Sequence, residues 1–342
     1  MSFDPRNILV IDLGQLGDVV LSLPALHGIR ERFPKAAITV AVGKQGAGVV
    51  ELSGYANSTL VVDRVLRDGL KLVSLAYIAK LVQRVRRSRF DFVIDLHSLS
   101  ETNLLGFLSG APTRLYSRRP RRSLDFLANF RPRPPVEVDH RQRHLIDRYL
   151  DVLIPLGVKD ANRLPHLKTR AADNAAIENI LKQENADVGI PLVGLFPGAG
   201  HPSRRWPLER FAELADFLVR NDHIRILVFL GPEERAFVQD IRRRFPPSTL
   251  ILDKLTIPQV AAAQARLAVF VSNDTGPMHI ASAVGTPVVL LLDKRAPQSY
   301  LPQGDRHQII YSSAINDVTV EEVYTAARTV LTGNRSATLF AS

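Results

Sequence analysis

Short apolar runs alternate with amphipathic stretches along the first half of the chain. Residues 7–13 (NILVIDL) form a continuous apolar run, typical of a strand buried on both faces, and a helical pattern follows at 19–32. Further strands are predicted at 38–42, 59–63 and 90–96, and helices at 47–52 and 72–87. Strands that alternate with helices predict a doubly wound parallel sheet.

The second half shows the same alternation with different motifs. Strands are predicted at 191–196, 224–230, 249–252, 267–271 and 288–292, and helices at 208–220, 233–245, 257–265, 277–284 and 319–331. A chain of 342 residues exceeds what one hydrophobic core usually supports. We therefore predict two Rossmann-like α/β domains, at 1–165 and 185–332, joined by a linker region at 166–184 that carries one helix.

The charge of the chain indicates an acidic partner. The formal net charge is +10 and the pI is about 10.1, which suits a phosphorylated substrate, an anionic lipid or nucleic acid. The absence of cysteine excludes disulfides, thiolate nucleophiles and cysteine-bound metals. No apolar run reaches the roughly 20 residues that cross a bilayer, and the first residues lack a signal-peptide pattern, so we expect a cytoplasmic protein.

Much of this charge lies in an arginine-rich segment between Arg114 and Arg148. The segment holds ten arginines, four acidic residues and no lysine. Its densest part contains Arg118, Arg119, Arg121 and Arg122. Such a segment is either a binding surface for phosphates and anionic lipid or a solvated loop.

Three motifs follow predicted strands, and ligands of open α/β sheets bind outside the carboxyl ends of the strands. The motifs are GQLGD at 14–18, PGAGHPSRRWP at 197–207 and NDTGPMH at 273–279. The third motif combines cap-type side chains with Gly276 and Pro277, which predicts a helix start. Free N–H groups and the helix dipole make such a start suitable for phosphate, although an ordinary capped helix is the alternative.

Single residues in these motifs have two interpretations each. Arg204 can make bidentate contacts with a diphosphate, or it belongs to a solvated basic loop in which Trp206 only packs. Asp18 is either a general base or the cap of the helix that follows it. His279 is as suited to a structural role as to a functional one.

Several common sites are missing from the sequence. There is no GxGxxG and no GxxxxGK[ST], which argues against standard dinucleotide and ATPase sites. There is also no Asp-x-Asp pair, the usual carboxylate clamp for a metal-bound sugar nucleotide. We therefore predict no metal site and no cofactor.

Taken together, three segments resemble glycosyltransferase family 9, the bacterial heptosyltransferases of lipopolysaccharide core assembly. They are LGDVVLSLPAL (16–26), PGAGHPSRRWPLERFAEL (197–214) and SNDTGPMHIASAVGTPVV (272–289), in the order and spacing of the family. The resemblance implies a GT-B fold of two Rossmann-like domains that face a cleft. It also implies an acceptor bound by the N-terminal domain, a nucleotide-sugar donor bound mainly by the C-terminal one, and metal-free transfer with inversion.

The resemblance assigns roles to individual positions. The catalytic aspartate of the family's Gly-Asp motif matches Asp18, and a basic residue two before the tryptophan, usually lysine, matches Arg204. The predicted donor-binding residues are Gly17, Pro197, Gly198, Ala199, Arg204, Trp206, Asp274, Thr275, Gly276 and His279. The predicted acceptor-binding residues are Arg118, Arg119, Arg121 and Arg122.

This chain departs from the family pattern at two places. Asp293-Lys294-Arg295 stands where family members commonly have Gly-Pro-Thr or Gly-Pro-Ser, so the sequence leaves the exact sugar and nucleotide open. Arginine in place of lysine at position 204 retains the charge but changes the geometry of its contacts.

These observations predict an inverting, metal-independent glycosyltransferase. We expect it to move heptose from ADP-heptose to a lipopolysaccharide-core-like or other lipid-linked saccharide, in peripheral contact with the anionic inner membrane and without a nucleic-acid partner. One alternative is a sugar-nucleotide epimerase, which needs acid and base groups within the donor site and no acceptor. A nucleic-acid-binding protein is the other alternative, but no helix-turn-helix and no aromatic-interleaved basic platform supports it.

Overall fold

The computed structural model describes residues 3–63, 72–120, 123–137, 143–158, 161–186 and 189–333. The chain forms two compact units: Met1–Pro165 with Gln298–Leu301, and His166–Pro297 with Pro302–Ser342. Residues 166–184, which we predict as a linker, therefore belong to the second unit. Their helix α7 (Ala171–Gln183) packs on α10 (Ile257–Gln264) and buries Ile177 and Leu181, so this segment contributes to a hydrophobic core.

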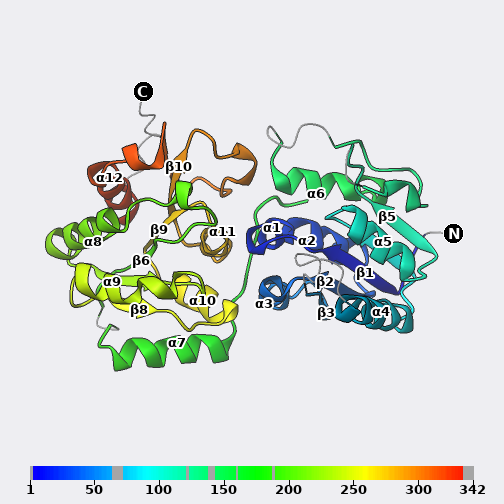
Figure 1. The fold of residues 1–342 in the computed structure, drawn as a ribbon, viewed down its shortest axis with the longest axis horizontal. Coiled ribbons are helices and arrows are strands. Elements are labelled where there is room, and N and C mark those ends of the chain that lie inside the picture. The colour runs from blue at the N-terminus through cyan, green and yellow to red at the C-terminus, as the bar shows by residue number, and fades with distance from the viewer. Residues whose placement is uncertain are drawn as a thin grey trace. The chain divides into compact units, whose positions relative to one another are not determined.

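The first unit is built on a sheet of five parallel strands (Figure 1). Their spatial order is β3 (Ser58–Val61), β2 (Ala37–Val42), β1 (Asn7–Asp12), β4 (Phe92–Asp95) and β5 (Thr113–Tyr116). In the register of the central strands, Ile8 of β1 lies between Ile38 and Phe92. The last five residues of β1 are buried, as the apolar run predicts.

Helices cover both faces of this sheet, as right-handed crossovers require. The helices of the first unit are α1 (Leu16–Leu21), α2 (Leu23–Arg32), α3 (Lys44–Ser53), α4 (Leu72–Arg87), α5 (Ser100–Leu108) and α6 (Leu145–Leu153), with short 3-10 turns η2 (Asp125–Leu127), η3 (Ile154–Leu156) and η6 (Gln298–Tyr300). One core cluster combines Val85 of α4 and Leu105 of α5 with Leu9 of β1, so α4 and α5 share one face.

The single helix that we predict at 19–32 is in fact two helices. The first begins at Leu16 and the second at Leu23, with Ser22 between them. Pro24 lies in the first turn of α2, where its missing N–H costs no helical hydrogen bond. The break follows from this proline, which the amphipathic pattern does not reveal.

The second unit contains a sheet of six parallel strands. Their order is β11 (Gln308–Ser312), β10 (Val288–Asp293), β9 (Val269–Asn273), β6 (Leu192–Phe196), β7 (Arg225–Phe229) and β8 (Leu250–Leu252). Besides α7 and α10, its helices are α8 (Leu208–Asp222), α9 (Val238–Arg244), α11 (Gly276–Ala283) and α12 (Val320–Leu331), with 3-10 turns η4 (Pro202–Arg204), η5 (Glu234–Phe237) and η7 (Ile315–Asp317). The core on one face joins α8, α9 and α12.

The sequence pattern misses two of the four edge strands, β5 and β11. Each pairs with a neighbour on one side only, and each is partly exposed. The apolar signal of such strands is weak because only part of each one enters the core. Among the described helices, none combines the length and hydrophobicity needed to cross a membrane.

Candidate functional site

Two aspartates end the central strands of the first sheet. Asp12 closes β1 and Asp95 closes β4, and both are fully buried. Asp12 accepts a hydrogen bond from the Gly14 N–H at 3.1 Å, while Asp95 accepts from the Ser98 N–H and the Asn103 amide, each at 2.7 Å. Burial raises the pKa of Asp12 to about 6 and that of Asp95 to about 7. Neither residue is among the predicted site residues, although the sequence shows that each carboxylate ends a buried strand, where ligands of such sheets bind.

Asp18 lies beside Asp12 because the chain turns tightly between them. Asp18 is in the first turn of α1, half-buried, and its carboxylate accepts a hydrogen bond from the Gln15 N–H at 2.8 Å. A Cβ atom at Gly14 would lie 2.5 Å from the Asp18 Cβ and 3.0 Å from the Asp12 Oδ1, so only glycine fits there. The Asp18 charge contributes to the raised pKa of Asp12. Asp18 therefore does cap its helix, and the same carboxylate lies within a cluster of titratable groups.

Two tyrosines belong to this cluster. Burial raises the pKa of the Tyr149 phenol, and the charges of Asp12 and Asp18 raise it further. Tyr300 comes from η6, far along the sequence; burial raises its pKa, Asp18 adds to the effect, and the Arg148 side chain bonds its hydroxyl. Neither tyrosine is apparent from the sequence, because both reach Asp18 only through tertiary packing.

Acidic residues hold much of the arginine-rich segment in place. Glu137 binds Arg119 at 3.1 Å through one carboxylate oxygen and Arg148 through the other, and all three side chains are largely buried. Asp125 binds Arg133 at 2.7 Å and lies 3.9 Å from Arg118.

The interpretation of a wholly solvated loop is therefore wrong for these arginines. Arg119 also lowers the pKa of both Asp12 and Asp95, so it lies near the aspartate cluster. Arg121 and Arg122, two of the predicted acceptor-binding residues, lie outside the described residues.

In the second unit, Asn273 ties the end of β9 to the glycine loop after β6. Its amide donates to the carbonyl oxygens of Pro197 and Gly198 at 3.2 and 3.0 Å, and its carbonyl accepts from the Trp206 N–H at 3.0 Å. Pro197, Gly198 and Ala199 are buried. Asn273 thus brings together two motifs that are separated by more than 60 residues, a role that its cap-type side chain alone does not indicate.

Trp206 needs a correction. Its side chain is only 1% exposed, its indole N–H donates to the Val318 carbonyl at 2.9 Å, and its ring packs edge-on against Phe211. A buried indole whose only N–H already donates to a carbonyl has no group left to bind the nucleotide-sugar donor. Trp206 is a packing residue of the core, as the alternative interpretation held.

Arg204 and Asp274 form an ion pair at 3.2 Å between η4 and the end of β9. Burial raises the pKa of Asp274, and Arg204 opposes this shift. Both residues lie around one narrow gap with Asp293, which ends the neighbouring strand β10. Asp293 binds the Arg295 guanidinium at 2.7 Å, and this contact lowers the pKa of Asp293.

The predicted helix start after β9 is present. Thr275 precedes α11, and Gly276 and Pro277 open it. The first N–H groups of a helix lack partners within the helix, so this end can bind an anion. His279 is 5% exposed and lies one turn further in.

Glu234 is a further acid at this site that the motifs do not include. It is 6% exposed, and its carboxylate lies between the loops that follow β6 and β7. A Cβ atom at Gly231 would lie 2.7 Å from this carboxylate, and one at Gly198 would be closer still. The two glycines therefore make room for an acid at the carboxyl edge of the sheet, and burial raises its pKa. Across the part of the chain that the structure describes, no three or more histidine, aspartate or glutamate side chains form a group that could hold a metal ion.

A family model and curated relatives identify the family of this chain. Residues 78–326 match the sequence model of glycosyltransferase family 9 (heptosyltransferase). The chain is 24% identical over 313 residues to the lipopolysaccharide core heptosyltransferase OpsX of Haemophilus influenzae, with 90% of this chain and 84% of that protein covered.

Solved structures are similar over almost the whole chain. The glycosyl transferase family 9 protein of Veillonella parvula has a TM-score of 0.86 at 25% identity and covers 98% of this chain and 99% of its own. The E. coli ADP-heptose lps heptosyltransferase II has a TM-score of 0.79 at 20% identity, with 97% and 100% covered. These similarities confirm the predicted GT-B fold with two Rossmann-like parallel sheets.

Proposed function

Because the chain belongs to glycosyltransferase family 9, the heptosyltransferases, we propose that this glycosyltransferase moves heptose from ADP-heptose to a lipopolysaccharide-core-like or other lipid-linked saccharide. The E. coli relative is an ADP-heptose lps heptosyltransferase, which supports this donor and acceptor. The observation in the molecule that carries the proposal is the position of Asp18 beside Asp12, at the carboxyl end of β1.

The proposed reaction is a single inverting displacement. An acceptor hydroxyl attacks the anomeric carbon, the bond from that carbon to the diphosphate breaks, and ADP leaves with the electron pair. Asp18 takes the proton of the hydroxyl as general base. The hydrogen bond from the Gln15 N–H fixes one carboxylate oxygen and so orients the group.

The second unit supplies groups suited to the nucleotide diphosphate. Arg204 and the N–H groups at the start of α11 can bind the leaving phosphates as negative charge builds on them. Glu234 can accept hydrogen bonds from ribose hydroxyls, the role of the acid in many Rossmann-like sites. Thr275 and Gly276 remain proposed donor contacts through their backbone.

Arg295 offers a second guanidinium for the same diphosphate. Asp293 holds it with two contacts, at 3.2 and 2.7 Å, and Asp293 borders the same narrow gap as Arg204. Where the family commonly has a neutral Gly-Pro-Thr loop, this chain therefore presents a cation beside the donor site. We propose that it binds the donor diphosphate together with Arg204.

Arg118 and Arg119 remain proposed contacts for anionic groups of the acceptor. Glu137 neutralises only one of the two guanidinium charges that it binds, so the Arg119–Glu137–Arg148 cluster has a net positive charge. That charge lies near the aspartates and Asp18, where an acceptor must place its hydroxyl.

We propose that no metal ion takes part, since arginines and a helix start can take the place of a cation at the diphosphate. The test is to supply the protein with ADP-heptose and a heptose-deficient lipopolysaccharide, and to measure ADP release and sugar transfer with and without EDTA. Equal transfer in both is expected. A loss with EDTA that magnesium or manganese restores would refute the metal-free mechanism.

The same assay separates the epimerase alternative. A heptosyltransferase releases ADP in proportion to heptose transferred, and it leaves the sugar of unreacted donor unchanged. Interconversion of the donor sugar without any acceptor would instead identify an epimerase. Thermal shifts with ADP, UDP and GDP would show which nucleotide is bound, because ligand at roughly 100 times its Kd adds about 2.7 kcal/mol.

A further inference from the structure

A second basic surface lies outside the arginine-rich segment, at the end of α4. Arg84, Arg86, Arg87 and Arg89 are all exposed, and none of them pairs with an acidic side chain among the described residues. The nearest acid in the sequence, Asp91, is bound to the backbone N–H groups of residues 6 and 7. These four charges are therefore available to a partner.

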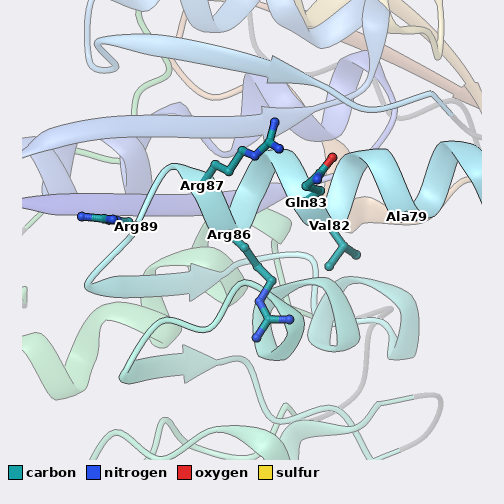
Figure 2. Close-up of a pocket in the computed structure, with 6 residues that line it drawn as sticks. All are labelled: Ala79, Val82, Gln83, Arg86, Arg87 and Arg89. Carbon is teal, nitrogen blue, oxygen red and sulfur yellow. The ribbon is translucent and has the colours of Figure 1, made fainter.

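The end of α4 also carries an open concavity of about 620 Å³. Its lining residues are Ala79, Val82, Gln83, Arg86, Arg87 and Arg89. In Figure 2, Arg86 and Val82 point to one side of α4, and Arg87 and Gln83 point to the other. The lining combines the apolar side chains of Ala79 and Val82 with three arginines. Such a mixture suits a bilayer surface, where anionic headgroups lie above an apolar interior.

Exposed apolar side chains continue this surface onto α5 and η2. Leu104 and Phe107, one helical turn apart on α5, are each 44% exposed, and Phe126 of η2 is 70% exposed. Both α4 and η2 pack against α5.

Contacts join the basic and apolar parts of this surface. The Arg86 Nε lies 3.9 Å from the position of a Cβ at Gly110, just beyond α5. The Arg114 guanidinium lies 5.4 Å from the centre of the Phe107 ring and donates to the Leu127 carbonyl, next to Phe126. One acid, Glu101, is exposed at the start of α5.

We propose that this α4–α5 surface, formed by Arg84, Arg86, Arg87, Arg89, Leu104, Phe107 and Phe126, docks the protein on an anionic phospholipid bilayer. Arginines bind lipid phosphates while phenylalanine and leucine side chains enter the boundary with the acyl chains. The proposal rests on the proposed function in one respect, since a lipid-linked acceptor gives the enzyme a reason to be at a membrane. It locates the membrane contact on α4 and α5, whereas the sequence indicates the arginine-rich segment. Most arginines of that segment that the structure describes are bound to acids.

The test measures co-sedimentation of the full chain with vesicles of phosphatidylcholine containing phosphatidylglycerol, and with pure phosphatidylcholine. Each basic residue near an anionic surface contributes about 1 kcal/mol, which is about a fivefold change in the vesicle binding constant, so Arg86→Gln/Arg87→Gln/Arg89→Gln should weaken binding roughly 100-fold at low salt. Phe126→Ser should weaken it by about tenfold, with little dependence on salt.

A matched control is available in the second unit. Arg242, Arg243 and Arg244 are three exposed arginines at the end of α9, so their triple glutamine variant removes the same formal charge from another helix end, where Arg243 and Arg244 pair with Asp240 and Glu209. It should bind vesicles nearly as the parent does. Equal losses in both triple variants would overturn the proposal in favour of a net-charge effect.

Two further outcomes decide the matter. If the α4 variant keeps vesicle binding but loses binding to duplex or single-stranded DNA in a filter assay, the surface is a nucleic-acid site and the proposal is wrong. Calorimetry with ADP tests donor binding independently of vesicle binding. The α4 variant should bind ADP with the same Kd as the parent. Failure of the parent to bind ADP would refute the proposed donor and leave the vesicle result standing.

Discussion

Both sheets place aspartates at the carboxyl ends of neighbouring central strands, yet the two pairs have different surroundings. In the first unit, Asp12 and Asp95 are buried beside backbone N–H groups, hydroxyls and an amide, and burial raises their pKa to about 6 and about 7. In the second unit, Asp274 and Asp293 each contact an arginine. This contact lowers the pKa of Asp293, and at Asp274 it opposes the rise that burial causes.

The difference shows how one residue type at one place in a fold can serve two purposes. A buried carboxyl without a direct cation binds a proton more tightly, which suits proton transfer. A carboxylate that contacts a guanidinium stays charged and holds that cation in position for an anionic ligand. The four experiments below test this division between a proton-handling unit and an anion-binding unit.

The largest effect is expected for Asp18→Asn. Asparagine retains an oxygen that can accept from the Gln15 N–H, so the free energy of unfolding should change by less than about 1 kcal/mol. It cannot take a proton, so kcat should fall by roughly 10²–10⁴-fold. Calorimetry should show an unchanged Kd for ADP, because the change is confined to the first unit. A variant that keeps most of its turnover would leave Asp18 with only its capping role.

Asp12→Asn tests the pH dependence of the first unit. The folded pKa of Asp12, about 6, exceeds its ordinary value of 3.8, so the folded state binds the extra proton between these values. The stability of the parent should therefore fall as the pH rises from about 4 to above 6, by on the order of 3 kcal/mol. The asparagine variant lacks this loss.

Urea denaturation at pH 4 and pH 7.5 measures the difference. The control is Asp216→Asn, which removes an exposed carboxylate from α8 and should follow the parent. Parallel pH dependence in the parent and in Asp12→Asn would show that Asp12 does not titrate in this range.

Arg204→Gln tests the anion-binding unit. Loss of a hydrogen bond to a charged group costs about 1.5–3 kcal/mol, so the Kd for ADP should rise about 10- to 100-fold. Arg204→Lys should recover part of the affinity, since lysine is the usual residue of the family. Arg220→Gln, which breaks another exposed arginine–aspartate pair in this unit, should leave the Kd unchanged. Equal affinity in the parent and Arg204→Gln would remove Arg204 from the donor site.

The smallest effect is expected for Arg118→Gln/Arg121→Gln/Arg122→Gln. If these arginines meet anionic groups of the acceptor, the acceptor KM should rise by a few-fold at low salt and less at high salt, with the donor KM unchanged. Arg143→Gln, in the same segment and paired with Asp151, serves as the control. An unchanged acceptor KM would assign the acceptor to other residues of the first unit.

The alternation of apolar runs and amphipathic stretches was sufficient to predict both parallel sheets and the positions of the three motifs at strand ends. This prediction depends only on local sequence, because buried strands and amphipathic helices each have a characteristic spacing of apolar residues. The pattern also placed Asp18, Arg204 and Asp274 in segments that follow predicted strands, and the family resemblance gave these residues their roles.

Only the tertiary structure decided which distant groups share these sites. The Trp206 indole meets a carbonyl 112 residues away and is thereby buried, Glu137 binds two arginines on different elements, and η6 brings Tyr300 to Asp18 from the far part of the chain. Contacts of this kind depend on the path of the chain through space and leave no periodic mark on the residues that make them. The sequence therefore determined where the sites lie along each sheet, and packing determined which of the carboxyls there contact an arginine and how deeply each is buried.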